Sequence, residues 1–195
     1  MKTTDSGNIK ILLERVSNND QKAFGILFQM FYKRLLNFAY QYVRTKEIAE
    51  EIVSDVFIKL WNKRAEITKV EKPEAYLFIS VKNGSLNYLE KFSLLQVCQI
   101  PESSRSELVN TNNPQKELEW KELLFKMDEA ISTLPAECQR IFRLSKEEGF
   151  KAKEVAEILN ISPRTVETQL YRAVRKIDDI LSSYLQRSFK KKEVK

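Results

Sequence analysis

Apolar residues recur at helical spacing in two blocks of the chain, from about residue 8 to residue 92 and from about residue 115 to residue 185. The stretch between them, residues 93–114, is rich in serine, asparagine and proline, which is typical of a linker. Only four glycines and five prolines occur in the whole chain, so few positions interrupt a helix. The pattern predicts an all-α fold with two small helical domains joined by a flexible linker. The expected bounds are 1–92, 93–114 for the linker, 115–188, and 189–195 for a basic tail.

The first block contains three strongly patterned segments. Residues 23–42 are apolar almost all round, as in a helix that is buried on several sides. Residues 47–61 place apolar side chains at four-residue intervals on one face and acidic side chains on another. After a loop with several basic residues, residues 74–92 predict a third helix.

The second block divides into four predicted helical segments. Pro135 suits the first turn of a helix, where its missing N–H group is not needed. Gly149 suits the left-handed position that often ends a helix. The four segments are 115–132, 135–148, 152–159 and 163–185.

Residues 151–170 carry the most specific local pattern, that of a helix-turn-helix. Asn160 tolerates the left-handed conformation of a tight turn. Ser162 can cap the second helix, and Pro163 is preset for its first position. The predicted buried positions are Val155 and Leu159 on the first helix, Ile161 in the turn, and Val166, Leu170, Val174 and Ile177 on the second helix.

The buried stripe leaves the opposite face of the second helix outward. The first residues of such a helix reach base edges in the major groove, where arginine pairs with guanine and glutamine with adenine. Basic residues further along contact phosphates. The predicted DNA contacts are Arg164, Thr165, Thr168, Gln169, Tyr171, Arg172, Arg175 and Lys176. The alternative is a plain helical hairpin with a solvated basic face, but such a hairpin does not require all these turn and cap residues in register.

Composition and charge exclude several classes of function. The net charge of +6 and the pI near 9.2 favour polyanionic partners through counterion release. The chain has no histidine, and its two cysteines, Cys98 and Cys138, form no CxxC pair. No metal site, cofactor or enzymatic activity is therefore expected. The chain also shows no signal peptide and no membrane-spanning run, so we expect a cytoplasmic protein.

Residues 49–61 read AEEIVSDVFIKLW, with an acidic row beside the apolar one. Together with the helix-turn-helix, this segment resembles a bacterial RNA polymerase sigma factor of the sigma-70 family, in its small extracytoplasmic-function (ECF) group. In that family the acidic face of sigma region 2 docks on the coiled coil of the largest polymerase subunit. The resemblance implies that Glu51, Asp55 and Glu47 bind core polymerase, and Ser54 stands where glutamine is commoner.

Residues 73–89, PEAYLFISVKNGSLNYL, resemble the family's helix for the minus-10 promoter element. Promoter opening requires an extruded base to be captured beside strand phosphates. Asn87 stands where aspartate is usual and Glu90 where a basic residue is usual, while Gly84 costs about 1 kcal/mol within a helix. Taken alone, Tyr76, Phe78 and Tyr88 are more often core residues than stacking surfaces. The implied minus-10 contacts are Lys63, Arg64, Lys69, Lys72, Tyr76, Lys82, Asn83 and Asn87.

The second block is similar to sigma region 4, which reads the minus-35 element. Leu134 and Pro135, the segment 138–144 and the pair Glu148-Gly149 match the opening of that region. The resemblance implies a sigma factor that directs core RNA polymerase to specific promoters and helps initiate transcription. Its implied partners are core RNA polymerase, promoter DNA and a membrane-bound anti-sigma factor, with no small-molecule substrate. Two weak contacts on one tethered chain reinforce each other only when polymerase holds both, so the free protein should bind promoter DNA poorly.

An alternative function is a stand-alone helix-turn-helix activator or repressor, such as a response regulator. That class needs a receiver or ligand domain, and the first block lacks the alternating strands and helices of a receiver. An enzyme is a third alternative, which the absence of a glycine-rich phosphate loop and of metal-ligand spacing disfavours.

Overall fold

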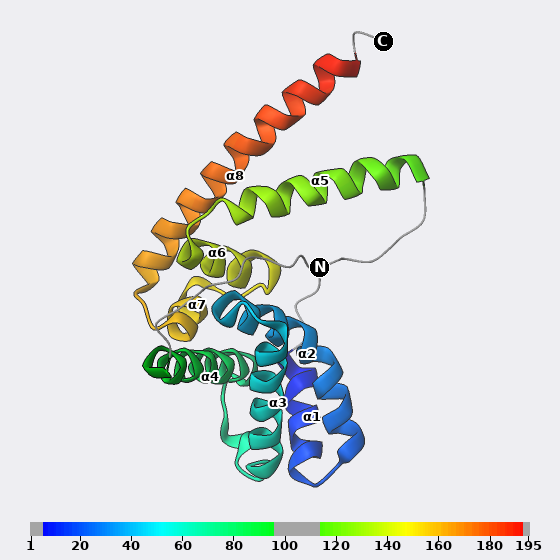
Figure 1. Cartoon of the computed structure of the whole chain (residues 1–195). Helices are drawn as coiled ribbons and strands as arrows, with labels where there is room; N and C mark the ends of the chain where they lie inside the picture. The colour runs from blue at the N-terminus through cyan, green and yellow to red at the C-terminus, as the bar shows by residue number, and fades with distance from the viewer. Residues whose placement is uncertain (1–5, 96–113, 193–195) are drawn as a thin grey trace. The chain divides into compact units, whose positions relative to one another are not determined.

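A computed structural model describes residues 6–95 and 114–192, and all regular secondary structure in these two stretches is helical (Figure 1). This confirms the predicted all-α fold. The described residues divide into two compact units, an N-terminal one, with which residues 153–161 also group, and a C-terminal one. Most of the predicted linker, with Cys98, and the last three residues of the predicted tail lie outside the described residues. None of the helices in the described stretches has both the length and the apolar run that a membrane span requires.

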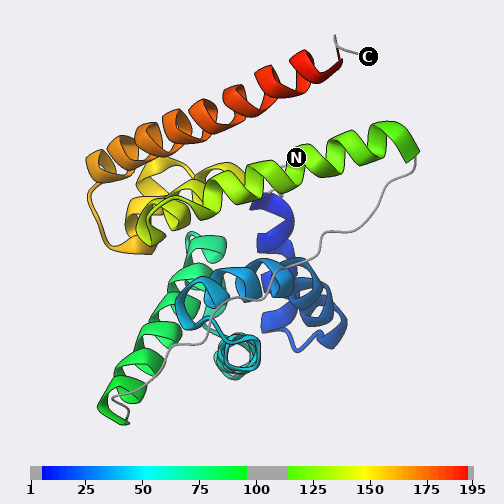
Figure 2. The same cartoon turned by 45° about the horizontal axis from the view of Figure 1, so that its top comes forward.

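The N-terminal unit is a bundle of four α-helices and one short 3₁₀ turn (Figures 1 and 2). The second helix packs against each of the other three. The three helices predicted in this block are all present, each slightly longer than expected. The elements are α1 (Ser6–Ser17), α2 (Gln21–Val43), α3 (Lys46–Asn62), η1 (Ile67–Lys69) and α4 (Pro73–Leu95).

Aromatic packing around α2 forms the core of the N-terminal unit. Phe28 of α2 contacts Phe57 of α3, with ring centroids 4.8 Å apart. Further along α2, Phe38 meets Phe78 of α4 at 5.1 Å, and Phe31 between them is fully buried. The wide apolar surface of α2 is therefore covered on several sides, as its sequence pattern predicts.

Both ends of α2 are set by local hydrogen bonding. The Asp20 carboxylate caps the first turn by accepting from the backbone N–H groups of Lys22 and Ala23 at 2.9 and 3.0 Å. The Ala23 hydrogen bond, with that of Arg15, holds the pKa of Asp20 below its usual value. At the other end, Arg44 adopts the left-handed conformation, with φ of 57°, and turns the chain toward α3.

Helices α3 and α4 approach each other closely at a glycine. A Cβ atom on Gly84 of α4 would lie 3.0 Å from Cγ2 of Ile52 on α3. Ile52 is itself buried. This close approach explains why a residue that weakens helices stands in the middle of α4.

The C-terminal unit is built around α8, against which α5 and α6 pack. Its core consists of Ala130, Ile131 and Leu134 near the end of α5, Cys138 and Phe142 from α6, and Ala173 and Ile177 from α8. Burial raises the pKa of the Cys138 thiol, so the thiol is a protonated core group. The helical elements along this second part of the chain are α5 (Pro114–Ser132), α6 (Ala136–Phe142), η2 (Arg143–Glu147), α7 (Ala152–Leu159) and α8 (Pro163–Lys192).

The segment predicted as one helix over 135–148 is in fact two pieces. Pro135 stands just before α6, and η2 is a turn of π-helix. Arg143 holds this turn in place, because its guanidinium donates to Glu147 at 2.8 Å and to Asp128 of α5 at 2.7 Å. Gly149 then takes a φ of 79°, which confirms the predicted left-handed position.

Replacing Gly25 or Gly84 by alanine should separate helix propensity from helix packing. Gly25 lies on an exposed side of α2, and a methyl group added there would have no other atom within 4 Å, so Gly25→Ala should stabilise the protein by about 0.5–1 kcal/mol. Gly84→Ala should gain less or lose stability, because the new methyl group presses on Ile52. Urea unfolding followed by Trp61 fluorescence, in a Trp120→Phe background, measures both. An equal gain in stability from the two variants would show that the close contact between Gly84 and Ile52 does not affect the free energy of unfolding.

Candidate polymerase and nucleic-acid interfaces

The turn between α7 and α8 has the geometry that the sequence predicts for a helix-turn-helix. Asn160 adopts the left-handed conformation with φ of 59°. The backbone N–H of Ile161 donates to the carbonyl of Ala156 at 3.0 Å and closes the end of α7. Ser162 Oγ accepts from the backbone N–H of Thr165 at 3.0 Å, which confirms the predicted cap of α8.

The buried positions of the two helices differ in part from those predicted. On α7, Val155 is buried as expected, but Ile158 is fully buried where Leu159 was predicted and Leu159 is only half-buried. On α8, Ala173 is fully buried, whereas Val174 is 43% exposed. The prediction for Val174 is wrong because a helix turns about 100° per residue. The seventh residue after Val166 therefore returns to the buried face and the eighth passes beyond it.

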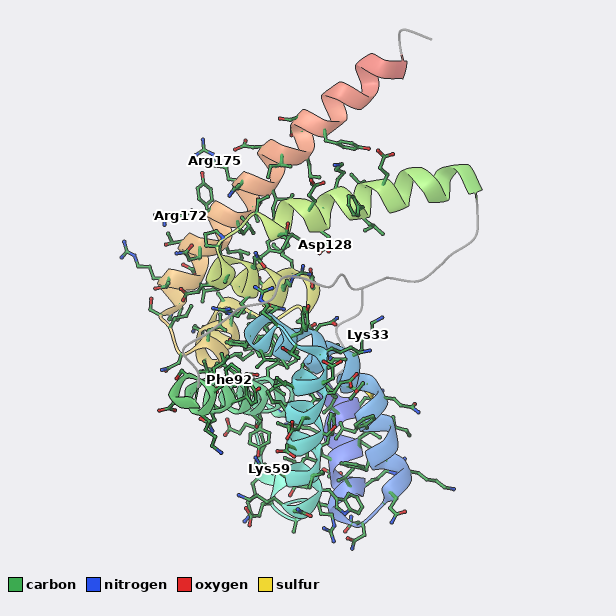
Figure 3. The ribbon with its side chains drawn as sticks, viewed as in Figure 1. Lys33, Lys59, Phe92, Asp128, Arg172 and Arg175 are labelled. Carbon is green, nitrogen blue, oxygen red and sulfur yellow. The ribbon has the colours of Figure 1, made fainter. Side chains whose placement is uncertain are left out.

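The outward face of α8 is a polar and basic surface, as predicted. Arg172 and Arg175 are exposed and project from the helix (Figure 3). Lys176 is exposed too, although its ammonium group donates to the Thr133 carbonyl at 2.8 Å. Thr165 and Gln169 are half-buried at the flanks of this face. The remaining predicted contacts, Arg164, Thr168 and Tyr171, are all exposed, and Tyr171 is 67% exposed.

The sequence prediction omitted one exposed residue of this face, Glu167. It lies three residues after Arg164 and four residues before Tyr171, a spacing that places all three on one side of the helix. The sequence contained enough information to include Glu167, because the helical spacing that selected Arg164 and Tyr171 also selects the residue between them.

The acidic row on α3 is exposed along its whole length. Glu47, Glu51 and Asp55 all face solvent, as the pattern predicts. Ile58, three residues after Asp55, is 57% exposed on the same helix and lies off its apolar face. An exposed isoleucine beside a carboxylate is the kind of apolar residue that anchors a protein interface, and sequence reasoning missed it.

A groove of about 460 Å³ lies between α3 and α4. Glu51, Asp55 and Lys59 line it from α3. From α4 it is lined by residues that include Tyr76, Asn83 and Asn87. Residues predicted to bind polymerase and residues predicted to contact the minus-10 element thus share the border of one groove.

Arg64, a predicted DNA contact, is engaged within the protein. Its Nε donates to the side-chain oxygen of Asn19 at 2.6 Å, and another guanidinium nitrogen donates to the Trp61 carbonyl at 2.9 Å. The guanidinium also lies 4.8 Å from the centre of the Trp61 ring. These contacts tie the end of α3 to the turn before α2. Lys63, Lys69 and Lys72 are all exposed.

Lys82 is only 8% exposed, although it was predicted to be a DNA contact and was therefore expected on the surface. Burial lowers the pKa of its ammonium group. Lys82 Nζ has no hydrogen-bond partner among the described residues. It is nevertheless not a buried unpaired atom, since Gln41 Oε1 is the only such side-chain nitrogen or oxygen in the described part of the chain. Lys82 Nζ therefore keeps contact with solvent. The stem of Lys82 is therefore packed while its charge reaches the surface.

The aromatic residues of α4 divide between core and surface. Phe78 is fully buried, which confirms the expectation of a core residue. Tyr88 is half-buried and stacks on Phe92, with ring centroids 5.8 Å apart. Tyr76 is 36% exposed at the groove, so it is the aromatic ring of the three that is most accessible to a ligand.

Comparison with known families gives two matches, one in each half of the chain. The model of sigma-70 region 2 matches residues 27–93, and the model of sigma-70 region 4 matches residues 124–177. The first match contains α3 and all but the last two residues of α4, and the second contains the helix-turn-helix.

Curated relatives match nearly the whole chain. The ECF RNA polymerase sigma-E factor of Escherichia coli (strain K12) is 24% identical over 189 residues, which cover 91% of this chain and 96% of the relative. The RNA polymerase sigma-H factor of Pseudomonas aeruginosa is 21% identical over 182 residues, covering 90% of this chain and 94% of the relative.

Two solved structures share the fold. The structure of CnrH in complex with the cytosolic domain of CnrY has a TM-score of 0.58 at 20% identity and covers 90% of this chain and 98% of that chain. The sigma factor RpoE of Bartonella quintana, in complex with the anti-sigma factor NepR, has a TM-score of 0.61 at 19% identity. The match covers 83% of this chain and 98% of that chain.

The two matched regions stand in the same chain and together span well over half of it, one with the acidic helix and the other with the helix-turn-helix. These features define a transcription initiation factor, and the chain belongs to the sigma-70 family of RNA polymerase sigma factors, in its ECF group. As a sigma factor it directs core RNA polymerase to promoters and helps initiate transcription. This result favours the predicted function over a stand-alone activator or repressor.

Replacing Ser162 should loosen the start of α8. Ser162→Ala removes the acceptor of the Thr165 N–H group and should cost about 1 kcal/mol. Ser162→Thr keeps an acceptor oxygen and serves as the matched control. Amide hydrogen exchange at Thr165 measures the effect, and we expect faster exchange only in the alanine variant. Unchanged exchange in that variant would mean that the cap does not hold the first turn.

Proposed function

We propose that three separate surfaces divide the work of this sigma factor. The acidic face of α3 binds core polymerase, the α4 region contacts the minus-10 element, and α8 reads the minus-35 element. The observation that carries the proposal is the charge of the exposed faces, which is negative on α3 within region 2 and positive on α8 within region 4. A negative face suits a basic protein partner and not DNA, whereas a positive face suits DNA.

The polymerase-binding surface consists of Glu47, Glu51 and Asp55, with Ile58 as an apolar contact. The three carboxylates are exposed along α3 and steer a basic partner toward it. Ile58 then supplies apolar area that becomes buried in the complex.

The minus-10 surface lies along α4 and the loop before it. The amide side chains of Asn83 and Asn87 offer both donors and acceptors to an extruded base at the border of the groove, and Tyr76 offers a ring for stacking. The lysines hold strand phosphates, while Arg64 acts by fixing the end of α3 or by exchanging its internal contacts for a phosphate. The proposed residues are Lys63, Arg64, Lys69, Lys72, Tyr76, Lys82, Asn83 and Asn87.

The minus-35 surface is the outward face of α8. Its first two turns present Arg164, Thr165, Thr168 and Gln169 to base edges, since these positions of a recognition helix enter the major groove. Tyr171, Arg172, Arg175 and Lys176 follow and contact the backbone of the duplex.

An anti-sigma factor is a further proposed partner, and we expect it to be membrane-bound. The solved structures of similar fold include CnrH with the cytosolic domain of CnrY and RpoE with the anti-sigma factor NepR. A partner of this kind would cover the charged faces of α3 and α8. The protein itself carries out no bond chemistry in this proposal and acts in the cytoplasm.

Run-off transcription tests the proposed function. Core polymerase is combined with the protein on genomic DNA, and transcript starts are mapped with and without it. Starts that require the protein and share two upstream elements are expected. Their absence, or tight promoter-specific binding by the protein without polymerase at physiological salt, contradicts the proposal.

Two substitutions should affect the two ends of the chain differently. Asp55→Lys reverses the charge of the α3 face and should weaken core binding by about tenfold or more, with selection of the minus-35 element unchanged once core is saturated. Arg164→Ala should leave core binding intact and reduce discrimination at the minus-35 element by about tenfold. Titration with labelled core polymerase measures the first effect, and transcription from promoters with intact or altered minus-35 elements measures the second.

Glu14→Lys is the control for charge reversal, because Glu14 is exposed on α1 and belongs neither to the proposed polymerase contacts nor to the proposed minus-35 contacts that these two assays measure. It should behave as the wild type in both assays. Identical effects of Asp55→Lys and Arg164→Ala would contradict the division of work between the two faces.

A further inference from the structure

A single carboxylate interrupts the basic face of α8. Glu167 is the only acidic residue between positions 163 and 177, a stretch with four arginines and lysines. Its side chain is exposed, and it makes no hydrogen bond or ion pair with another described residue. The carboxylates of Glu129 and Glu147, in contrast, are paired with Lys126 and Arg143. The carboxylate of Glu167 is therefore available to a ligand.

The position of Glu167 places it where the helix reads bases. It stands one turn after Arg164 and one turn before Tyr171, and both of these neighbours are exposed. The first two turns of a recognition helix are the part that reaches base edges in the major groove. A carboxylate in this position meets either phosphates, which repel it, or the donors of the bases.

Stabilisation of α8 itself does not account for Glu167. Negative charge favours a helix N-terminus, but this effect falls off within the first turn, and Glu167 is the fifth residue of α8. No lysine or arginine among the described residues of α8 pairs with it.

Among the bases, only cytosine N4 and adenine N6 offer donors in the major groove. Adenine places its N7 acceptor beside that donor, and N7 would repel a carboxylate, whereas cytosine presents the amino group alone. We propose that Glu167 is a specificity-determining residue that accepts a hydrogen bond from the N4 amino group of a cytosine in the minus-35 element. The inference rests on the proposed minus-35 function of α8 and adds to it the base that one residue selects.

The test uses the holoenzyme formed by the full chain and core polymerase. Promoter duplexes randomised across the upstream element are transcribed, and the selected sequences are counted. With the wild type, one position should prefer cytosine over thymine by about tenfold. Glu167→Ala should abolish that preference. Glu167→Gln should move it to adenine, because glutamine pairs with both N6 and N7 of adenine.

Asp178→Asn is the matched control. It removes the same charge from an exposed position on α8 three turns further along, so it should leave base preference unchanged. A cytosine preference that disappears with Glu167→Ala and shifts with Glu167→Gln supports the proposal.

Two other outcomes overturn the proposal in distinguishable ways. If the wild type selects an upstream element and both Glu167 variants select the same bases, even with uniformly stronger binding, Glu167 reads no base and the minus-35 function of α8 still stands. If the wild-type holoenzyme selects no upstream sequence at all, the proposed minus-35 function fails, and the role of Glu167 fails with it.

Discussion

The close contact between Gly84 and Ile52 is the constraint on which the functional surfaces of the N-terminal unit depend. It lets α4 lie against α3 closely enough that the acidic row of one helix and the amide groups of the other line the same groove. Aromatic packing against α2 holds both α3 and α4 in place, because Phe57 of α3 and Phe78 of α4 each contact an aromatic ring of α2. The proposed polymerase contact and the proposed minus-10 contact thus depend on one packed unit, in which rigid side-chain packing couples the two helices.

Charge distinguishes the exposed helix faces of the two units. The outer face of α3 is acidic, whereas the outer face of α8 is basic apart from Glu167. Such an arrangement limits errors of docking, since the α3 face repels DNA and the α8 face attracts it. The modest net charge of +6 is therefore the sum of local surfaces of opposite sign, and these surfaces are the ones proposed to bind the partners.

Not every basic residue of the promoter-binding region is free to meet a phosphate. Arg64 uses its guanidinium within the fold, on Asn19, the Trp61 carbonyl and the Trp61 ring. Lys82 packs its stem and presents only its charged end. Both residues stabilise the region that would hold DNA, so their substitution would alter the packing of the surface as well as its charge.

The amino-acid sequence was sufficient to predict the helical fold, the helix-turn-helix with its Asn160 turn and Ser162 cap, and the exposed charges of α3 and α8. These features follow from local rules of periodicity, capping and turn conformation, which involve residues close in the chain. The packing of the helices was needed to show that Arg64 and Lys82 are held by their surroundings and that Gly84 faces Ile52. These outcomes depend on neighbours from other helices and on the exact rotation of each helix, and no local pattern contains either one.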